Sequence, residues 1–178
     1  YSTPNIEAIV ALNPDLVLTD GTVSELTRLE GLGIPLIVID PKDIDGILRD
    51  IELLGNITGS QERAKDIMSE MRQRIDAVAN TVSNAPRPRV FYVIDAVTDP
   101  SKPWTAGPGS FIDALINLAG GKNVADQAQG PWIQFNVEEL VASDPEIIVV
   151  DSTQGTVAIS PAEIKELPGW KETSAVRE

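Results

Sequence analysis

The sequence predicts an α/β protein in which two Rossmann-like lobes with parallel sheets are joined by one long helix. Three observations lead to this fold class. Short β-branched runs alternate with helical patterns, one helical pattern is unusually long, and a 20-residue stretch occurs twice. A chain of 178 residues, of which 42% are hydrophobic, can bury a core in one domain or in two small lobes.

Four short apolar runs predict the strands, and helical patterns lie between them. The strands are expected at residues 16–19, 36–40, 90–94 and 147–150. The helices are expected at residues 6–12, 24–32, 44–54 and 111–119. A glycine directly follows each of the last three helical patterns, and glycine at this position commonly ends a helix. Strands that alternate with helices predict parallel sheets covered by helices.

Residues 60–82 form the most regular helical pattern of the chain. Apolar residues recur at intervals of three and four over about six turns, at Ala64, Ile67, Met68, Met71, Ile75, Val78, Ala79 and Val82. Ser60 is a candidate N-cap, and the two prolines after residue 85 stop the helix. An ordinary surface helix would show the same pattern, but the length and the position between two α/β regions favour a connector. We expect an N-terminal lobe at 1–57, the connecting helix at 58–84 and a C-terminal lobe at 85–178.

One 20-residue motif occurs twice. Residues 1–20, YSTPNIEAIVALNPDLVLTD, align without a gap with residues 132–151, WIQFNVEELVASDPEIIVVD. Both copies have Asn and Glu at their fifth and seventh positions, Val-Ala at the tenth and eleventh, Pro at the fourteenth and Asp at the end. Such a unit could arise independently in unrelated α/β proteins. Two copies around a long helix, however, predict two similar lobes related by pseudosymmetry.

Each copy of this motif predicts a helix, a turn at the proline and a buried strand. Asn5 and Asn136 are the predicted N-caps of the two helices. Glu7 and Glu138 fall in the first helical turn, where the helix dipole favours a carboxylate. The favourable interaction with the helix dipole is by itself a sufficient structural reason for a glutamate at each of these positions.

Composition excludes several classes of function. The formal net charge of −13 argues against binding to nucleic acid or to anionic lipid, because both need clustered basic residues. An acidic surface suits a cationic partner, although solubility alone explains most acidic surfaces. The chain has no cysteine, so it has no disulfide, thiol nucleophile or Cys-bound metal. Its apolar runs are too short to cross a bilayer.

Taken together, several stretches resemble the helical-backbone periplasmic (solute-)binding protein family of ABC importers, which includes iron-siderophore, haem and cobalamin binders. The stretches that carry the resemblance are residues 4–18, 29–40, 53–64, 104–126, 135–151 and 167–178. The resemblance implies capture of such a ligand in a cleft between the lobes and its delivery to a permease dimer. It implies no catalysis, no cofactor and no metal bound directly by the protein.

The resemblance also bears on the ends of the chain and on its location. Family members begin with strands before the position of Tyr1 and continue beyond that of Glu178, so the chain is expected to lack both ends. An extracytoplasmic location is implied, in the periplasm or at the cell surface. The protein could then be a lipoprotein, and contact with the membrane would come through an anchor before Tyr1 or through the permease.

The ligand-binding residues are expectations from the same resemblance. Tyr1 and Trp132 match positions where aromatic side chains of facing lobes line the cleft. Aromatic rings suit a flat, partly apolar ligand. A second group of candidates lies at loops and strand ends, namely Asp20, Trp104, Gly107, Gly109 and Ser110. A glycine-lined helix start can bind a carboxylate, although such a loop is usually only a turn, and Ser110 could cap the helix that begins at Phe111. Asp20 and Asp151 follow strand ends, where open α/β sheets bind ligands, but both could simply cap the next turn, and this is the expected role of Asp151.

The two repeat glutamates match the positions at which this family docks on its permease. Glu7 and Glu138 are therefore expected to pair with arginines of the two permease subunits. A two-fold symmetric permease needs two equivalent contacts, and a duplicated motif supplies them.

Three alternative functions remain open at this point. An enzyme such as a tetrapyrrole-metal chelatase has two similar lobes, but the chain lacks the histidine, cysteine, nucleophile-elbow and phosphate-loop motifs that such chemistry uses. Direct binding of zinc or manganese would also need imidazole ligands. A pure interaction module without a small ligand would need no aromatic-lined cleft.

Overall fold

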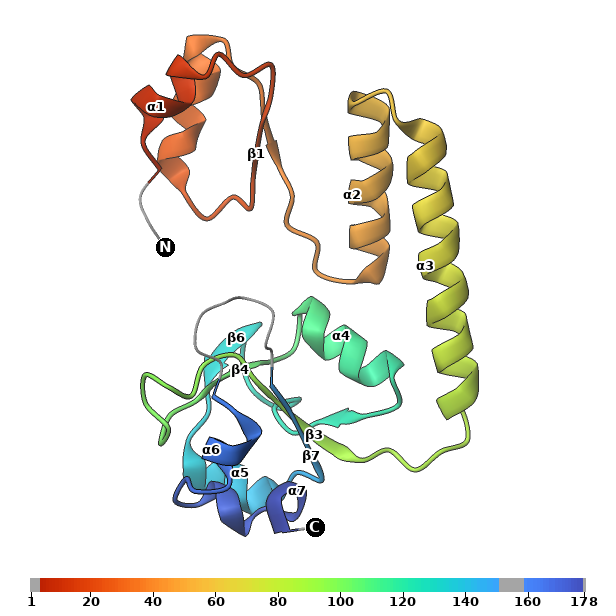
Figure 1. Ribbon diagram of the computed structural model, residues 1–178, viewed down its shortest axis with the longest axis vertical. Helices are drawn as coiled ribbons and strands as arrows, with labels where there is room; N and C mark the ends of the chain where they lie inside the picture. Colours follow the sequence, from red (N-terminus) through yellow and green to blue (C-terminus); the bar gives the residue numbers. More distant parts are fainter. Residues whose placement is uncertain (1–3, 151–158, 178) are drawn as a thin grey trace.

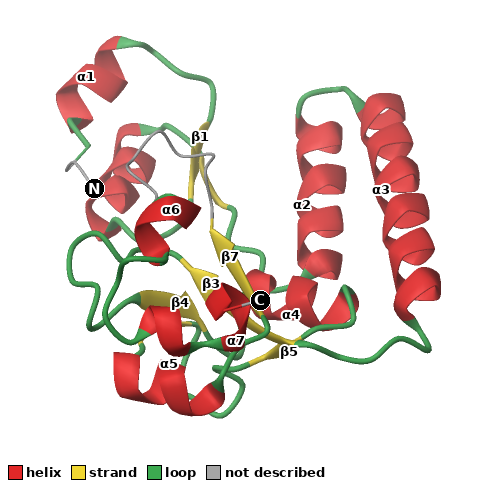
Figure 2. Cartoon of the chain, turned by 60° about the horizontal axis from the view of Figure 1, so that its bottom comes forward, coloured by secondary structure: helices red, strands yellow, loops and turns green. Residues whose placement is uncertain are grey.

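The computed structural model describes residues 4–150 and 159–177, and it confirms the predicted fold class (Figure 1). Two α/β parts each contain parallel strand pairs, and a helical hairpin lies alongside them (Figures 1 and 2). In the described part of the chain, no helix is both long enough and apolar enough to cross a membrane.

The N-terminal lobe contains the first copy of the repeat. It consists of α1 (Ile6–Ala11), β1 (Val17–Thr19), the 3-10 helix η1 (Ser24–Leu32) and β2 (Leu36–Val38). Strands β1 and β2 pair in parallel, as the alternating pattern predicts. The third element is a 3-10 helix rather than an α-helix, and it ends at Gly33, whose φ of 80° suits only glycine well.

Two long helices, α2 (Ile44–Ile57) and α3 (Gln61–Val82), form an antiparallel hairpin. The predicted end of α2 at Gly55 is wrong, because the helix continues to residue 57. A Cβ atom at Gly55 would overlap the Cβ of Ala64, so this glycine permits close approach of the two helices instead of ending one. The 22 residues of α3 agree with the predicted long helix, but the Ser60 side chain makes no capping hydrogen bond.

The C-terminal lobe is built on a three-stranded parallel sheet in the order β5-β3-β7 (Figure 2). The strands are β5 (Lys122–Asn123), β3 (Arg89–Val93) and β7 (Ile147–Val150). Around them lie α4 (Phe111–Leu118), α5 (Val137–Ser143), α6 (Pro161–Ile164), η2 (Trp170–Glu172) and α7 (Ser174–Arg177). Phe91 of the central strand is fully buried, and the ring of Trp170 meets it edge-on at 5.7 Å.

One strand pair of this lobe departs from the predicted parallel arrangement. Strands β4 (Trp104–Ala106) and β6 (Trp132–Gln134) pair antiparallel. Each has three residues and directly follows a proline, so neither shows a recognisable strand pattern in the sequence. In Figure 1 this pair lies on the side of the C-terminal lobe that is turned toward the N-terminal lobe.

Candidate functional site

The β4–β6 pair brings two of the predicted ligand-binding residues together. Trp104 lies opposite Gln134 and Ala106 lies opposite Trp132, so both tryptophans stand on the same face of the two-stranded ribbon. Their exposed fractions are 39% and 48%, high for such large apolar side chains. Phe111 adds a third ring that meets Trp132 edge-on at 6.2 Å. Trp104, Trp132 and Phe111 are called the aromatic face below.

Sequence reasoning missed Phe111, although its place was visible in the chain. It is the first residue of α4, directly after the predicted cap Ser110. An aromatic residue at a helix start is normally attributed to packing. Only the antiparallel pairing of β4 with β6 shows that its ring meets Trp132.

The loop between β4 and α4 holds this face in place. The Ser110 hydroxyl accepts the backbone N–H of Asp113 at 3.1 Å, which confirms the predicted cap, and donates to the Gly107 carbonyl at 2.8 Å. The Gly107 N–H donates to the Pro131 carbonyl at 2.9 Å. A Cβ atom at Gly107 would overlap the Gly130 carbonyl oxygen, so the close approach requires glycine. Ser110 is buried, and the backbone N–H of Gly107 is hydrogen-bonded to Pro131. Together these two residues connect the start of α4 to the segment that leads into β6.

Gly109 and Asn123 complete the support of the aromatic face. Gly109 adopts a φ of 84°, which favours glycine at this turn. The buried Asn123 side chain donates to the Ala106 carbonyl at 2.9 Å and to the Asp113 carboxylate at 2.8 Å. Asn123 therefore joins β4, α4 and β5. Sequence reasoning missed it because it follows two glycines and a lysine and looks like part of a turn.

The remaining predicted ligand residues lie elsewhere or outside the described residues. The Asp20 carboxylate accepts hydrogen bonds from the Thr22 backbone N–H at 3.0 Å and from the Thr22 hydroxyl at 2.7 Å. These bonds, the backbone one first, lower the pKa of Asp20 below its usual value. Asp20 thus caps the turn after β1, which was the alternative role considered for it, and its predicted contact with the ligand stays a prediction. Tyr1 and Asp151 lie outside the described residues.

The two predicted docking glutamates occupy equivalent positions in the two copies of the repeat. Glu7 and Glu138 are exposed in the first turns of α1 and α5. Each follows an asparagine cap, since the Asn5 side chain accepts the Ala8 N–H at 3.0 Å and that of Asn136 accepts the Glu139 N–H at 2.7 Å. Both predicted caps are therefore confirmed.

The surroundings of both glutamates are free of positive charge in the sequence. None of the 14 basic residues falls within residues 1–27 or 123–164. Accordingly, neither glutamate makes an ion pair within residues 4–150 and 159–177. The described part of the chain also has no cluster of three acidic residues suited to hold a metal ion.

Comparison with known proteins gives one family for the whole chain. The family described as "Periplasmic binding protein" matches residues 1–178. A cobalamin-binding protein of Halobacterium salinarum is 36% identical over 155 residues, which are 83% of this chain and 40% of the relative. A vitamin B12-binding protein of Yersinia pestis is 30% identical over 156 residues, which are 86% of this chain and 54% of the relative. The chain thus spans about half the length, or less, of these curated relatives.

Solved structures show the same fold. A periplasmic heme-binding protein from Roseiflexus sp. RS-1 superimposes with a TM-score of 0.80 at 26% sequence identity. The superposition covers 96% of this chain and 66% of that protein. The relatives are binding proteins rather than enzymes, as the sequence predicts.

Proposed function

The chain belongs to the periplasmic binding protein family, and we propose that it is part of the substrate-binding component of an ABC importer. The proposed ligand is a metal chelate of the cobalamin, haem or iron-siderophore type. The protein would capture this ligand outside the cytoplasm, between its two lobes, and deliver it to the permease.

The aromatic face is the observation that carries this proposal. Two half-exposed tryptophans and a phenylalanine share one surface of the C-terminal lobe. Planar rings bury a large area of a flat ligand and lose little conformational entropy, since each ring side chain has only two rotatable bonds. A small, strongly hydrated ion would gain nothing from such a surface.

The roles of the site residues follow from their contacts. Trp104 and Trp132 contact the ligand in this proposal, and Tyr1, the repeat equivalent of Trp132 in the sequence, is proposed as a further ligand contact. Gly107 and Ser110 hold the loop that positions the aromatic face, because their polar groups are already hydrogen-bonded within the lobe.

Docking on the permease is the second part of the proposal. Glu7 and Glu138 would each meet a basic side chain of one permease subunit. The absence of lysine and arginine from residues 1–27 and 123–164 supports this role, because no cation of those segments competes for the two carboxylates. Charged contacts of this kind set orientation and encounter rate more than affinity.

A binding panel tests the ligand part of the proposal. Cobalamin, haem and ferric siderophores are titrated into the full-length protein, with tryptophan fluorescence and calorimetry as readouts. At least one of them should bind, and Trp132→Ala or Trp104→Ala should weaken that binding about 10- to 100-fold, as loss of an aromatic anchor does. Leu12→Ala, an 80% exposed apolar position on the other lobe, is the matched control and should change nothing. Failure of every compound to bind would refute the proposal.

A further inference from the structure

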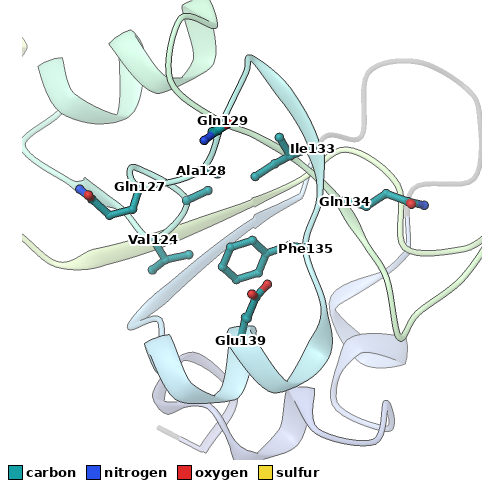
Figure 3. Close-up of a pocket in the computed structure, with 9 residues that line it drawn as sticks. Val124, Gln127, Ala128, Gln129, Ile133, Gln134, Phe135 and Glu139 are labelled. Carbon is teal, nitrogen blue, oxygen red and sulfur yellow. The ribbon is translucent and has the colours of Figure 1, made fainter.

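A hollow of about 470 Å³ lies in the C-terminal lobe beside α5, and the function proposed above does not use it (Figure 3). Its walls combine apolar side chains with three glutamines. The apolar ones include Val124, Ala128, Ile133 and Phe135, and the glutamines are Gln127, Gln129 and Gln134. Figure 3 shows the Glu139 carboxylate next to the Phe135 ring at one end of the hollow. The site therefore combines apolar side chains, an aromatic ring, neutral amide groups and one negative charge.

The carboxylate at this hollow has most of its bonding capacity free. Glu139 is exposed, and its side chain accepts one long hydrogen bond of 3.5 Å, from the Asn136 backbone N–H, within the described residues. This bond completes the capping box that Asn136 and Glu139 form at the start of α5. A carboxylate can accept about four hydrogen bonds. The hollow is lined by no lysine or arginine. An incoming cation would therefore meet an uncompensated negative charge.

These features select a basic side chain with a long apolar stem. The stem of an arginine can lie on Val124 and Ile133 while its planar head reaches Glu139 with two parallel hydrogen bonds. The same head can lie against the Phe135 ring and gain a cation–π contact. An anionic group would be repelled by Glu139, and a purely apolar one would leave the carboxylate desolvated and unpaired.

We propose that this hollow receives an arginine side chain of the permease subunit that docks at Glu138. The inference rests on the proposed docking function and adds a second contact to it. Glu138 and Glu139 are neighbours in the first turn of α5, so one basic segment of the partner could reach both.

The carboxylate of this second contact has no counterpart in the N-terminal copy of the repeat. The residue equivalent to Glu139 in the N-terminal copy is Ala8, which has no charge. A two-fold symmetric permease would therefore be held more strongly by the C-terminal lobe than by the N-terminal lobe. This asymmetry distinguishes the two permease subunits although their own surfaces are identical.

The test measures binding of the full-length protein to its importer in lipid nanodiscs, at low and at high salt. Glu139→Gln removes the charge but keeps a side chain that can complete the capping box, so α5 stays intact. Ala128→Leu fills the hollow without any change of charge. Glu166→Gln, exposed on the same lobe and outside the hollow, is the charge-matched control. Glu138→Gln reports on docking itself, and thermal unfolding verifies that every variant is folded.

Glu139→Gln and Ala128→Leu should each weaken binding about fivefold or more at low salt, while the control stays within about twofold. The loss from Glu139→Gln should shrink at high salt, whereas that from Ala128→Leu should persist. If Glu138→Gln weakens binding but both pocket variants bind normally, the second contact is refuted and docking stands. If Glu138→Gln also has no effect, docking at α5 itself is refuted.

Discussion

The two copies of the repeat have the same caps but different packing. In the C-terminal copy, Leu140 of α5 is completely buried, and it belongs to the core that contains Phe91 and Trp170. Its equivalent in the N-terminal copy, Ile9, is only half-buried, and α1 has no fully buried residue. The repeated sequence thus fixes a local helix–turn–strand unit, while residues outside the repeat decide how firmly the unit is held.

The turns of the two copies show the same contrast. Asn13 and Asp144 both adopt the left-handed conformation, with φ of 46° and 42°. The Asp144 carboxylate accepts the Ser174 N–H at 2.7 Å and the Ser174 hydroxyl at 2.9 Å, and it pairs with Arg89 at 3.3 Å. These partners come from α7 and β3, outside the repeat. Asn13 makes no comparable side-chain bond within the described residues, so among these residues only the second turn is anchored by its side chain.

The largest expected difference between the copies is in stability. Leu140→Ala should lower the free energy of unfolding by about 2–5 kcal/mol, because it leaves a cavity in a fully packed core. Ile9→Ala at the equivalent position should cost about 1 kcal/mol or less, since its side chain is partly solvated. Denaturant unfolding of the 178-residue chain that carries each exchange measures the two values. Equal losses would contradict the proposed difference in packing.

A smaller expected difference is in the response to acid. Hydrogen bonds from Ser174, the backbone one first, and then the charges of Arg177 and Arg89 lower the pKa of Asp144. A lowered folded-state pKa stabilises the protein above the unfolded-state value of about 3.9, and this stabilisation is lost as the pH falls through the folded-state value. At neutral pH, the Asp144→Asn variant should therefore have a lower melting temperature than the wild type. In strong acid the two melting temperatures should be equal.

Asn13→Asp provides the matched control for this pH dependence. It places the same carboxylate at the equivalent turn, where Ser174 and the two arginines are absent. Its melting temperature should follow that of the wild type from neutral pH into acid. If the melting temperature of Asp144→Asn stays below that of the wild type by the same amount at low pH, the carboxylate charge is not what anchors the turn.

Local signals in the sequence predicted most of the elements but fewer of the contacts between them. The asparagine caps, the strands of the repeat and the long helix follow from side-chain bonding and apolar periodicity. Gly55 was misjudged because its neighbour Ala64 comes from another helix, and sequence spacing does not reveal such a close approach. The antiparallel β4–β6 pair was missed for a related reason, since three-residue strands are defined by their partners.

The candidate site shows the same limit. Trp104 and Trp132 could be singled out as aromatic residues near glycines and prolines, but their common face depends on the register of β4 with β6. The roles of Asn123 and Glu139 depend on tertiary neighbours, so neither was predicted. The assignments of Glu7 and Glu138 to docking and of Trp104 and Trp132 to ligand binding stay predictions.

The most direct test of the account is a charge reversal at both copies of the repeat. The full-length variants Glu7→Lys, Glu138→Lys and the double variant are compared for importer affinity and for stimulation of importer ATPase activity. Each single exchange should weaken docking about tenfold or more and the double exchange further, with ligand affinity unchanged and Glu138→Lys the more damaging of the two. Normal importer affinity and stimulation by the double variant would contradict the claim that the duplicated motif forms the docking surface.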